Sequence, residues 1–170
     1  MNIYYSQIGE DVLINNNFIN TKRTDGTYIE IGGSDGVTLS NTKFFHDKLG
    51  FKGLLIEPVP HFFQNLVRNR PNDICINAAV DYKEGMSKFI GDSHVAGLDN
   101  YLSTPLRKKY LENAREYMVN TYPISKIIKQ AGLKYIDYFS IDVEGGELNV
   151  LETMDWSIPV YIITIELNEK

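Results

Sequence analysis

The chain has 170 residues, of which 43% are hydrophobic and 23% are charged, and its formal net charge is -5. This composition is typical of one globular domain, and the acidic balance argues against binding to a nucleic-acid backbone. The most apolar late run, IPVYIITIEL, is much shorter than the roughly 20 residues of a membrane-spanning helix, and the N-terminus has no signal-peptide pattern. A single cysteine, Cys75, excludes an internal disulfide and agrees with a reducing compartment. We therefore expect one soluble domain over residues 1–170, located in the cytoplasm.

Segments typical of strands and helices alternate along the chain. In chain order, we expect a strand at 28–32, a helix between Val37 and Gly50, a strand at 53–57, a helix at 61–70, a strand at 73–80, a short edge strand at 86–90, helices at 106–118 and 123–131, a strand at 136–143, a helix at 147–154 and a strand at 160–167. The strands are continuous apolar runs separated by helices, a pattern that predicts a mostly parallel sheet covered on both faces. The fold class is therefore α/β, a three-layer sandwich.

In such folds, ligands bind at the carboxyl ends of the strands. That rule selects three segments, namely 30–36, 57–60 and 142–147, and all three are rich in glycine or acidic residues. We expect them to form one site. The polar and aromatic segment 91–121 is the expected acceptor-side insertion, where Tyr101, Tyr110 and Tyr117 are candidates for stacking on sugar rings.

The first of these segments is a glycine turn with acidic residues. It reads Gly32-Gly33-Ser34-Asp35-Gly36 and is preceded by Glu30, so it lacks the G-x-G-x-x-G spacing of a dinucleotide site. Asp35 beside a pyrophosphate would place like charges a few ångströms apart. The same acids favour a ligand that carries an ammonium or a sulfonium, and S-adenosylmethionine carries both and has no phosphate. The glycines let the main chain approach this ligand closely.

The other two segments supply further carboxylates. Glu57 ends the second expected strand, where a carboxylate can accept hydrogen bonds from both hydroxyls of a ribose. Asp142 lies at the end of the expected strand at 136–143, and Glu144 directly follows it. Both are candidates for a general base, for anchors of an acceptor hydroxyl, or for ligands of a cation such as Mg²⁺. His61 and His94 are substitute candidates for the proton acceptor.

At this point the sequence resembles the FkbM-type methyltransferases, a branch of the Rossmann-like S-adenosylmethionine-dependent enzymes. The matching stretches are YSQIGED, YIEIGGSDGVTLSNT, GLLIEPVP, ICINAAV, the KEG turn and IDYFSIDVEGGELNVLETMDW. The resemblance implies methyl transfer to a hydroxyl oxygen, often on a sugar or a polyketide. It implies cofactor contacts by the glycine turn, a ribose contact by Glu57, an adenine border at Ala79, a place near the methyl group for Asp142, and a role for Gln7 in closing the site. Family members commonly have a further strand pair after the last strand expected here.

Two other functions compete with this one. The first is an NAD(P)-dependent oxidoreductase, for which Tyr122-x-x-x-Lys126 is the only support, since Pro123 follows the tyrosine and the glycine spacing is wrong. The second is a cofactor-binding or glycan-binding module of a larger protein that has lost catalysis. Measuring whether S-adenosylmethionine or NADH binds distinguishes the methyltransferase from the oxidoreductase. A methylation assay distinguishes the methyltransferase from the binding module.

Overall fold

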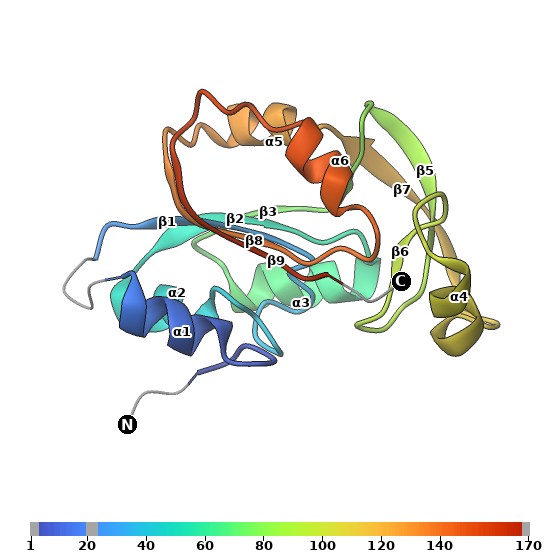
Figure 1. Cartoon of the computed structure of the whole chain (residues 1–170), viewed down its shortest axis with the longest axis horizontal. Helices are drawn as coiled ribbons and strands as arrows, with labels where there is room; N and C mark the ends of the chain where they lie inside the picture. Colours follow the sequence, from blue (N-terminus) through green and yellow to red (C-terminus); the bar gives the residue numbers. More distant parts are fainter. Residues whose placement is uncertain (1–3, 20–23, 168–170) are drawn as a thin grey trace.

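The computed structural model describes residues 4–19 and 24–167, which form a five-stranded and a four-stranded sheet (Figure 1). The larger sheet is entirely parallel and has the order β3-β2-β1-β8-β9. Its strands are β1 (Thr27–Ile31), β2 (Lys52–Ile56), β3 (Ile74–Ile76), β8 (Ile136–Ile141) and β9 (Val160–Ile165). The prediction of a mostly parallel sheet is confirmed.

The centre of this sheet brings three strand ends together. Ile31, at the end of β1, is paired with Ile56 of β2 on one side and with Ile141 of β8 on the other. The chain leaves β1 toward β2 and returns to the opposite side of β1 as β8, so the sheet changes direction at this point. Such a point leaves a crevice at the carboxyl ends of the strands.

Helices cover both faces of the five-stranded sheet, which confirms the three-layer, Rossmann-like arrangement (Figure 1). One face carries α1 (Glu10–Asn17), α2 (Lys43–Leu49) and α3 (Pro60–Asn69), and the other carries α5 (Ile124–Ala131) and α6 (Glu147–Glu152). Within the described part of the chain, no helix has the length and apolarity that crossing a membrane requires.

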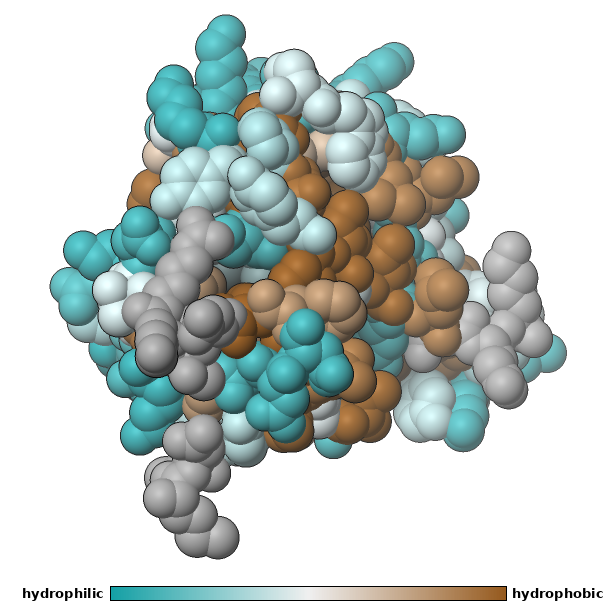
Figure 2. Space-filling view, turned by 60° about the vertical axis from the view of Figure 1, so that its left-hand side comes forward, coloured by the Kyte–Doolittle hydropathy of each residue, from teal (hydrophilic) through white to brown (hydrophobic). Residues whose placement is uncertain are grey.

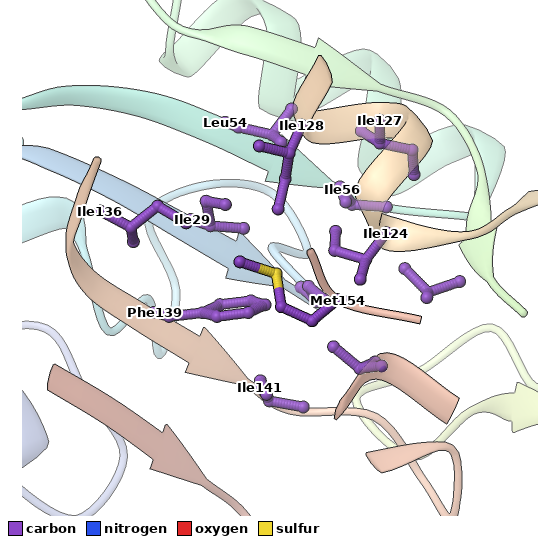
Figure 3. Packing of buried hydrophobic residues seen from close by; sticks show 13 residues of the cluster. Ile29, Leu54, Ile56, Ile124, Ile127, Ile128, Ile136, Phe139, Ile141 and Met154 are labelled. Carbon is purple, nitrogen blue, oxygen red and sulfur yellow. The ribbon is translucent and has the colours of Figure 1, made fainter. Parts of the chain in front are cut away.

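Apolar spacing explains why α5 packs where it does. Ile124, Ile127 and Ile128 fall at positions i, i+3 and i+4 and are all buried in one cluster with Ile29 and Phe139 of the sheet (Figure 3). Each isoleucine buried in this way stabilises the fold by about 1.5–3 kcal/mol. The apolar face of α5 therefore packs against the interior of β1 and β8.

The four-stranded sheet lies beside the carboxyl ends of the larger one (Figure 1). It has the order β4-β7-β5-β6, made of β4 (Ala79–Val80), β5 (Gly85–Ile90), β6 (Gly97–Leu98) and β7 (Glu116–Tyr122), and the short helix α4 (Thr104–Tyr110) connects β6 to β7. The predicted strand at 73–80 is therefore divided between the two sheets, as β3 and β4. The predicted edge strand at 86–90 exists as β5, but β7 and β6 flank it.

One predicted helix differs from the observed structure. The helix predicted at 106–118 is wrong, because α4 ends at Tyr110 and β7 begins at Glu116. In β7, Val119 and Thr121 are buried and Tyr117 is half-buried, while Met118 and Asn120 are exposed, a two-residue period that fits pairing with β5. The helix expected between Val37 and Gly50 is present as α2, which begins at Lys43 and ends before Gly50.

The edge strand β9 leaves apolar side chains in contact with solvent. Tyr161 and Ile163 are 68% and 36% exposed. Figure 2 shows a band of hydrophobic residues across one face of the molecule, bordered by hydrophilic ones. β9 is the last strand among the described residues, and it has a neighbour on one side, β8.

Candidate active site

A cavity of about 490 Å³ lies where the two sheets meet, at the carboxyl ends of β1, β2 and β8. This volume is in the usual range for a small-molecule site, about 300–1,000 Å³. Of the residues predicted for the site, the lining includes Gln7, Glu30, Gly32, Gly33, Ser34, Glu57, Ala79, Asp142 and Glu144. The three segments selected from the sequence therefore meet in one place.

Two glycines of the turn are required by geometry. Gly32 has a φ of +82°, and a Cβ atom there would overlap the carbonyl oxygen of Asp142. Gly36 has a φ of +78°, and its Cβ would lie 2.6 Å from Leu66 Cδ1 and 2.8 Å from Arg70 Cγ. Left-handed φ values are unfavourable for other residues, so both positions favour glycine. Gly36 packs beneath the turn and is not part of the cavity lining.

Glu30 is buried at the end of β1, and its carboxylate is surrounded by donors. The Ser40 hydroxyl and the Asn41 amide donate to it at 2.9 and 2.8 Å, and the Thr42 hydroxyl donates at 2.5 Å. Burial raises the pKa of this carboxyl, while the charge of Arg70 and the three hydrogen bonds act in the opposite direction. Glu30 also lines the cavity, so its remaining surface faces the ligand space.

The Asp35 carboxylate, predicted to contact the cofactor, forms its hydrogen bonds within its own turn. Its Oδ1 accepts hydrogen bonds from the amides of Val37 and Thr38 at 2.9 and 2.7 Å, and its Oδ2 accepts one from the Thr38 hydroxyl at 2.9 Å. Burial pushes the pKa of Asp35 upward, but these hydrogen bonds outweigh it and leave the pKa below its usual value. The carboxylate is turned back onto its own turn, and Asp35 is not part of the cavity lining.

Glu57 connects the end of β2 to the glycine turn. Its Oε2 accepts a hydrogen bond from the Ser34 amide at 2.8 Å, and its Oε1 accepts one from the Val59 amide at 2.7 Å. Burial raises the pKa of Glu57 to about 7, although both hydrogen bonds lower it. The carboxylate is thus held in one orientation beside the turn.

Three acidic residues meet at the other end of the cavity. Asp142 follows β8, Glu166 follows β9, and both line the cavity together with Glu144. The Asp142 amide donates to the Ile31 carbonyl at 3.2 Å, which ties the end of β8 to the end of β1. Burial, together with the negative charge and hydrogen bond of the neighbouring Glu166 and the charges of Glu144 and Glu30, raises the pKa of Asp142 to about 8. Burial and these neighbouring acids therefore favour the protonated form of Asp142 in the free protein.

A metal ion has little support from the side chains. Within residues 4–19 and 24–167, no group of three or more histidines, cysteines, aspartates and glutamates has an arrangement that could hold one. The properties of the acidic residues after β8 and β9 that bear on the site are therefore their negative charge and their protonation.

The imidazole that lines the cavity belongs to His94 and not to His61. His61 is exposed on the first turn of α3, and its ring centroid lies 4.2 Å from that of Phe62. His94 also lies against Phe62, with ring centroids 5.7 Å apart and ring planes at 24°. His94 is therefore the better placed of the two histidine candidates.

Sequence reasoning did not identify the residues that close the cavity from the four-stranded sheet. They include Phe89, Val95, Ala96, Gly97, Leu98 and Leu106. No motif marks them, since β5, β6 and α4 come together only through pairing between distant segments. Of the three tyrosines expected to face the acceptor, Tyr101 and Tyr110 line the cavity and Tyr117 does not.

The Tyr-x-x-x-Lys pattern lies outside this site. Neither Tyr122 nor Lys126 lines the cavity. The Lys126 ammonium lies 5.2 Å from the centre of the Tyr122 ring and forms an ion pair with Glu84. The pair is thus part of the surface of the four-stranded sheet and α5.

Comparison with known proteins agrees with this geometry. A family model described as a methyltransferase FkbM domain matches residues 30–170, which is more than half of the chain. The matched part contains the glycine turn, Glu57 and the acidic residues that follow β8 and β9. A comparison with curated proteins gave no match.

Proposed function

Because the chain belongs to the methyltransferase FkbM family, it is a methyltransferase, and we propose that it transfers the methyl group of S-adenosylmethionine to a hydroxyl oxygen of a sugar, a glycan or a related small molecule. The observation that carries the proposal is the charge of the cavity. Its lining contains Glu30, Glu57, Asp142, Glu144 and Glu166, and among the described residues no lysine or arginine. A pyrophosphate would be repelled there by about 1 kcal/mol per charge pair in water and about 4 kcal/mol at partial burial. A sulfonium and an ammonium are attracted.

The residues present fit this cofactor. Gly32 and Gly33 line the cavity without side chains, so their main chain would be open to the ligand, and the Glu57 carboxylate, fixed by the Ser34 and Val59 amides, would accept hydrogen bonds from the ribose hydroxyls. Ala79 would border the adenine, and Glu30 would bind the ammonium of the methionine part. When bound, S-adenosylmethionine supplies a methyl group made electrophilic by the positive sulfur.

Asp142 is the proposed proton acceptor, with Glu144 as the alternative. The acceptor hydroxyl oxygen forms a bond to the methyl carbon while the bond from carbon to sulfur breaks, and its proton passes to the carboxylate. A positive charge beside Asp142 lowers the raised pKa of that carboxyl and so releases its own proton. Positioning of the hydroxyl against the methyl carbon supplies much of the acceleration.

The acceptor is proposed to be a sugar because of the side chains on the far side of the cavity. Tyr101 and Tyr110 offer ring faces, and Glu144 and Glu166 offer hydrogen-bond acceptors for hydroxyl groups. The Tyr101 hydroxyl donates to Asp81 at 2.7 Å, which holds that ring in place. Apolar ring faces next to carboxylates suit a sugar, which has both C–H faces and hydroxyl edges.

Calorimetric titration of the purified chain with S-adenosylmethionine, S-adenosylhomocysteine and NADH tests the cofactor. We expect binding of the first two and none of NADH; binding of NADH alone would contradict the proposal. Transfer of a labelled methyl group to a panel of sugars tests the reaction. Cofactor binding without transfer to any hydroxyl acceptor would instead favour a binding module.

A further inference from the structure

Arg70 is a fully buried arginine directly behind the glycine turn. It lies at the end of α3, and its stem packs beneath Gly36. Its Nε and Nη1 atoms are buried without a hydrogen-bond partner among the described residues. Buried donors that lack partners cost about 1–3 kcal/mol each, so stability alone does not explain an arginine at this position.

Among the described residues, the Arg70 guanidinium nitrogen that has a hydrogen-bond partner is Nη2, and it points toward Glu30. Nη2 donates to the Thr42 hydroxyl oxygen at 2.5 Å and lies 3.6 Å from Oε2 of Glu30. The Thr42 hydroxyl has a single hydrogen, and its oxygen already accepts from Arg70, so that hydrogen is directed to Glu30, 2.5 Å away. A chain of donors thus runs from Arg70 through Thr42 to Glu30.

The other charged and titratable groups around Glu30 do not replace Arg70. Tyr28 on the same strand, Tyr138 on β8 and Asp142 directly after β8 interact with Glu30 electrostatically, and none of them carries a positive charge. Asp73 lies on the far side of Arg70, 3.7 Å from Nε. Arg70 therefore supplies the positive charge that opposes the effect of burial on the Glu30 carboxyl.

We propose that Arg70 is a positioning residue for the cofactor, which acts through Thr42 to direct the Glu30 carboxylate into the cavity and to favour its negatively charged form, so that Glu30 binds the ammonium of the methionine part. This inference rests on the proposed function. It predicts that loss of Arg70 weakens ligands that carry the ammonium and spares ligands that lack it. A purely structural role for Arg70 predicts equal loss for both.

The test compares Arg70→Met with Arg68→Met, which removes the same charge from an exposed position on the same helix. Calorimetry measures Kd for S-adenosylmethionine and for 5′-methylthioadenosine, which has the adenosine and the thioether but no ammonium. We expect Arg70→Met to weaken S-adenosylmethionine about tenfold, as for one charge-assisted contact, and to change 5′-methylthioadenosine less than about twofold. Arg68→Met should change neither.

A second arm uses Glu30→Gln as the background. If Arg70 acts through Glu30, Arg70→Met should have almost no further effect on Kd in Glu30→Gln. With Glu30 intact, the Kd for S-adenosylmethionine in Arg70→Met is divided by the Kd in the unsubstituted chain. This ratio should fall as pH rises from 6 to 8, because Glu30 in the variant ionises at a higher pH than in the unsubstituted chain. A ratio that is independent of pH, or a full effect in Glu30→Gln, would overturn the inference.

Two milder variants keep the test decisive if Arg70→Met does not fold. Arg70→Lys retains the charge, and its Kd for S-adenosylmethionine should stay within about threefold of that of the unsubstituted chain. Thr42→Val removes the hydroxyl that connects Arg70 to Glu30 and should weaken S-adenosylmethionine binding several-fold. Equal loss of both ligands in Thr42→Val would overturn the inference. If the unsubstituted chain binds neither S-adenosylmethionine nor S-adenosylhomocysteine, the proposed function itself fails.

Discussion

The wall of the cavity that comes from the five-stranded sheet is held by hydrogen bonds and tight backbone packing, whereas the wall from the four-stranded sheet consists largely of apolar and aromatic side chains. We call the first the sheet wall and define it by Gly32, Gly33, Ser34, Glu57 and Asp142; we call the second the loop wall and define it by Ala96, Leu98, Tyr101, Leu106 and Tyr110. In the sheet wall, the amides of Ser34 and Val59 fix the direction of the Glu57 carboxylate. Under the proposed function, the sheet wall would bind the cofactor, and the loop wall would bind the methyl acceptor.

The largest expected effect is at Asp142, in the sheet wall. Asp142→Asn removes the proposed proton acceptor and should lower turnover about 10²–10⁴-fold. Cofactor Kd should stay within a few-fold, because the glycine turn and Glu57 are unchanged. Labelled methyl transfer and calorimetry measure the two quantities. Asp155→Asn, on an exposed turn outside the cavity lining, is the matched control, and unchanged turnover in Asp142→Asn would remove the residue from catalysis.

A second prediction concerns the backbone of the sheet wall. Gly32→Ala places a Cβ against the Asp142 carbonyl at a positive φ and should lower the free energy of unfolding by about 3 kcal/mol or more. Gly132→Ala has a similar φ, +72°, but no atom within 4 Å of its Cβ, so it should cost only about 1–2 kcal/mol. Chemical denaturation measures both. Equal losses would show that the close approach of β8 to the turn does not matter.

The buried acids of the sheet wall predict how stability depends on pH. In the folded chain the pKa values of Glu57 and Asp142 are about 7 and about 8, whereas in the unfolded chain both carboxyls ionise near pH 4. The folded state therefore binds more protons over this range, and stability should fall as pH rises from about 4.5 to 8. Thermal unfolding at several pH values should show this decline in the unsubstituted chain and a much flatter curve in Glu57→Gln/Asp142→Asn. An exposed substitution, Glu112→Gln, should leave the slope unchanged.

The smallest expected effect is in the loop wall. Tyr110→Ala should raise KM for the sugar acceptor about three- to tenfold, with cofactor Kd unchanged, because one ring face is lost. Tyr117→Ala removes a tyrosine that does not line the cavity and should leave KM unchanged. Steady-state methylation kinetics measure the difference. A change in cofactor Kd in Tyr110→Ala would show that the two walls are not separate in function.

The parts of the fold that could be predicted depend on neighbouring residues. Apolar runs at 53–57 and 136–143 predicted two buried strands, and Gly50 and Gly132 ended helices as expected. The helix predicted at 106–118 failed because β7 is stabilised by β5, about thirty residues earlier in the chain. Local patterns report local structure, and a strand needs a partner that they do not identify.

The sequence by itself determined the parallel α/β layers, the family, and the placing of glycines and acidic residues at the strand ends, since these follow from short-range periodicity and from the order of the segments. Only the tertiary structure decided how each acid is used. It turned Asp35 back onto its own turn, set Arg70 behind Glu30, and brought Glu166 beside Asp142. The physical reason is that the charge and direction of a buried carboxylate depend on which distant groups fold against it.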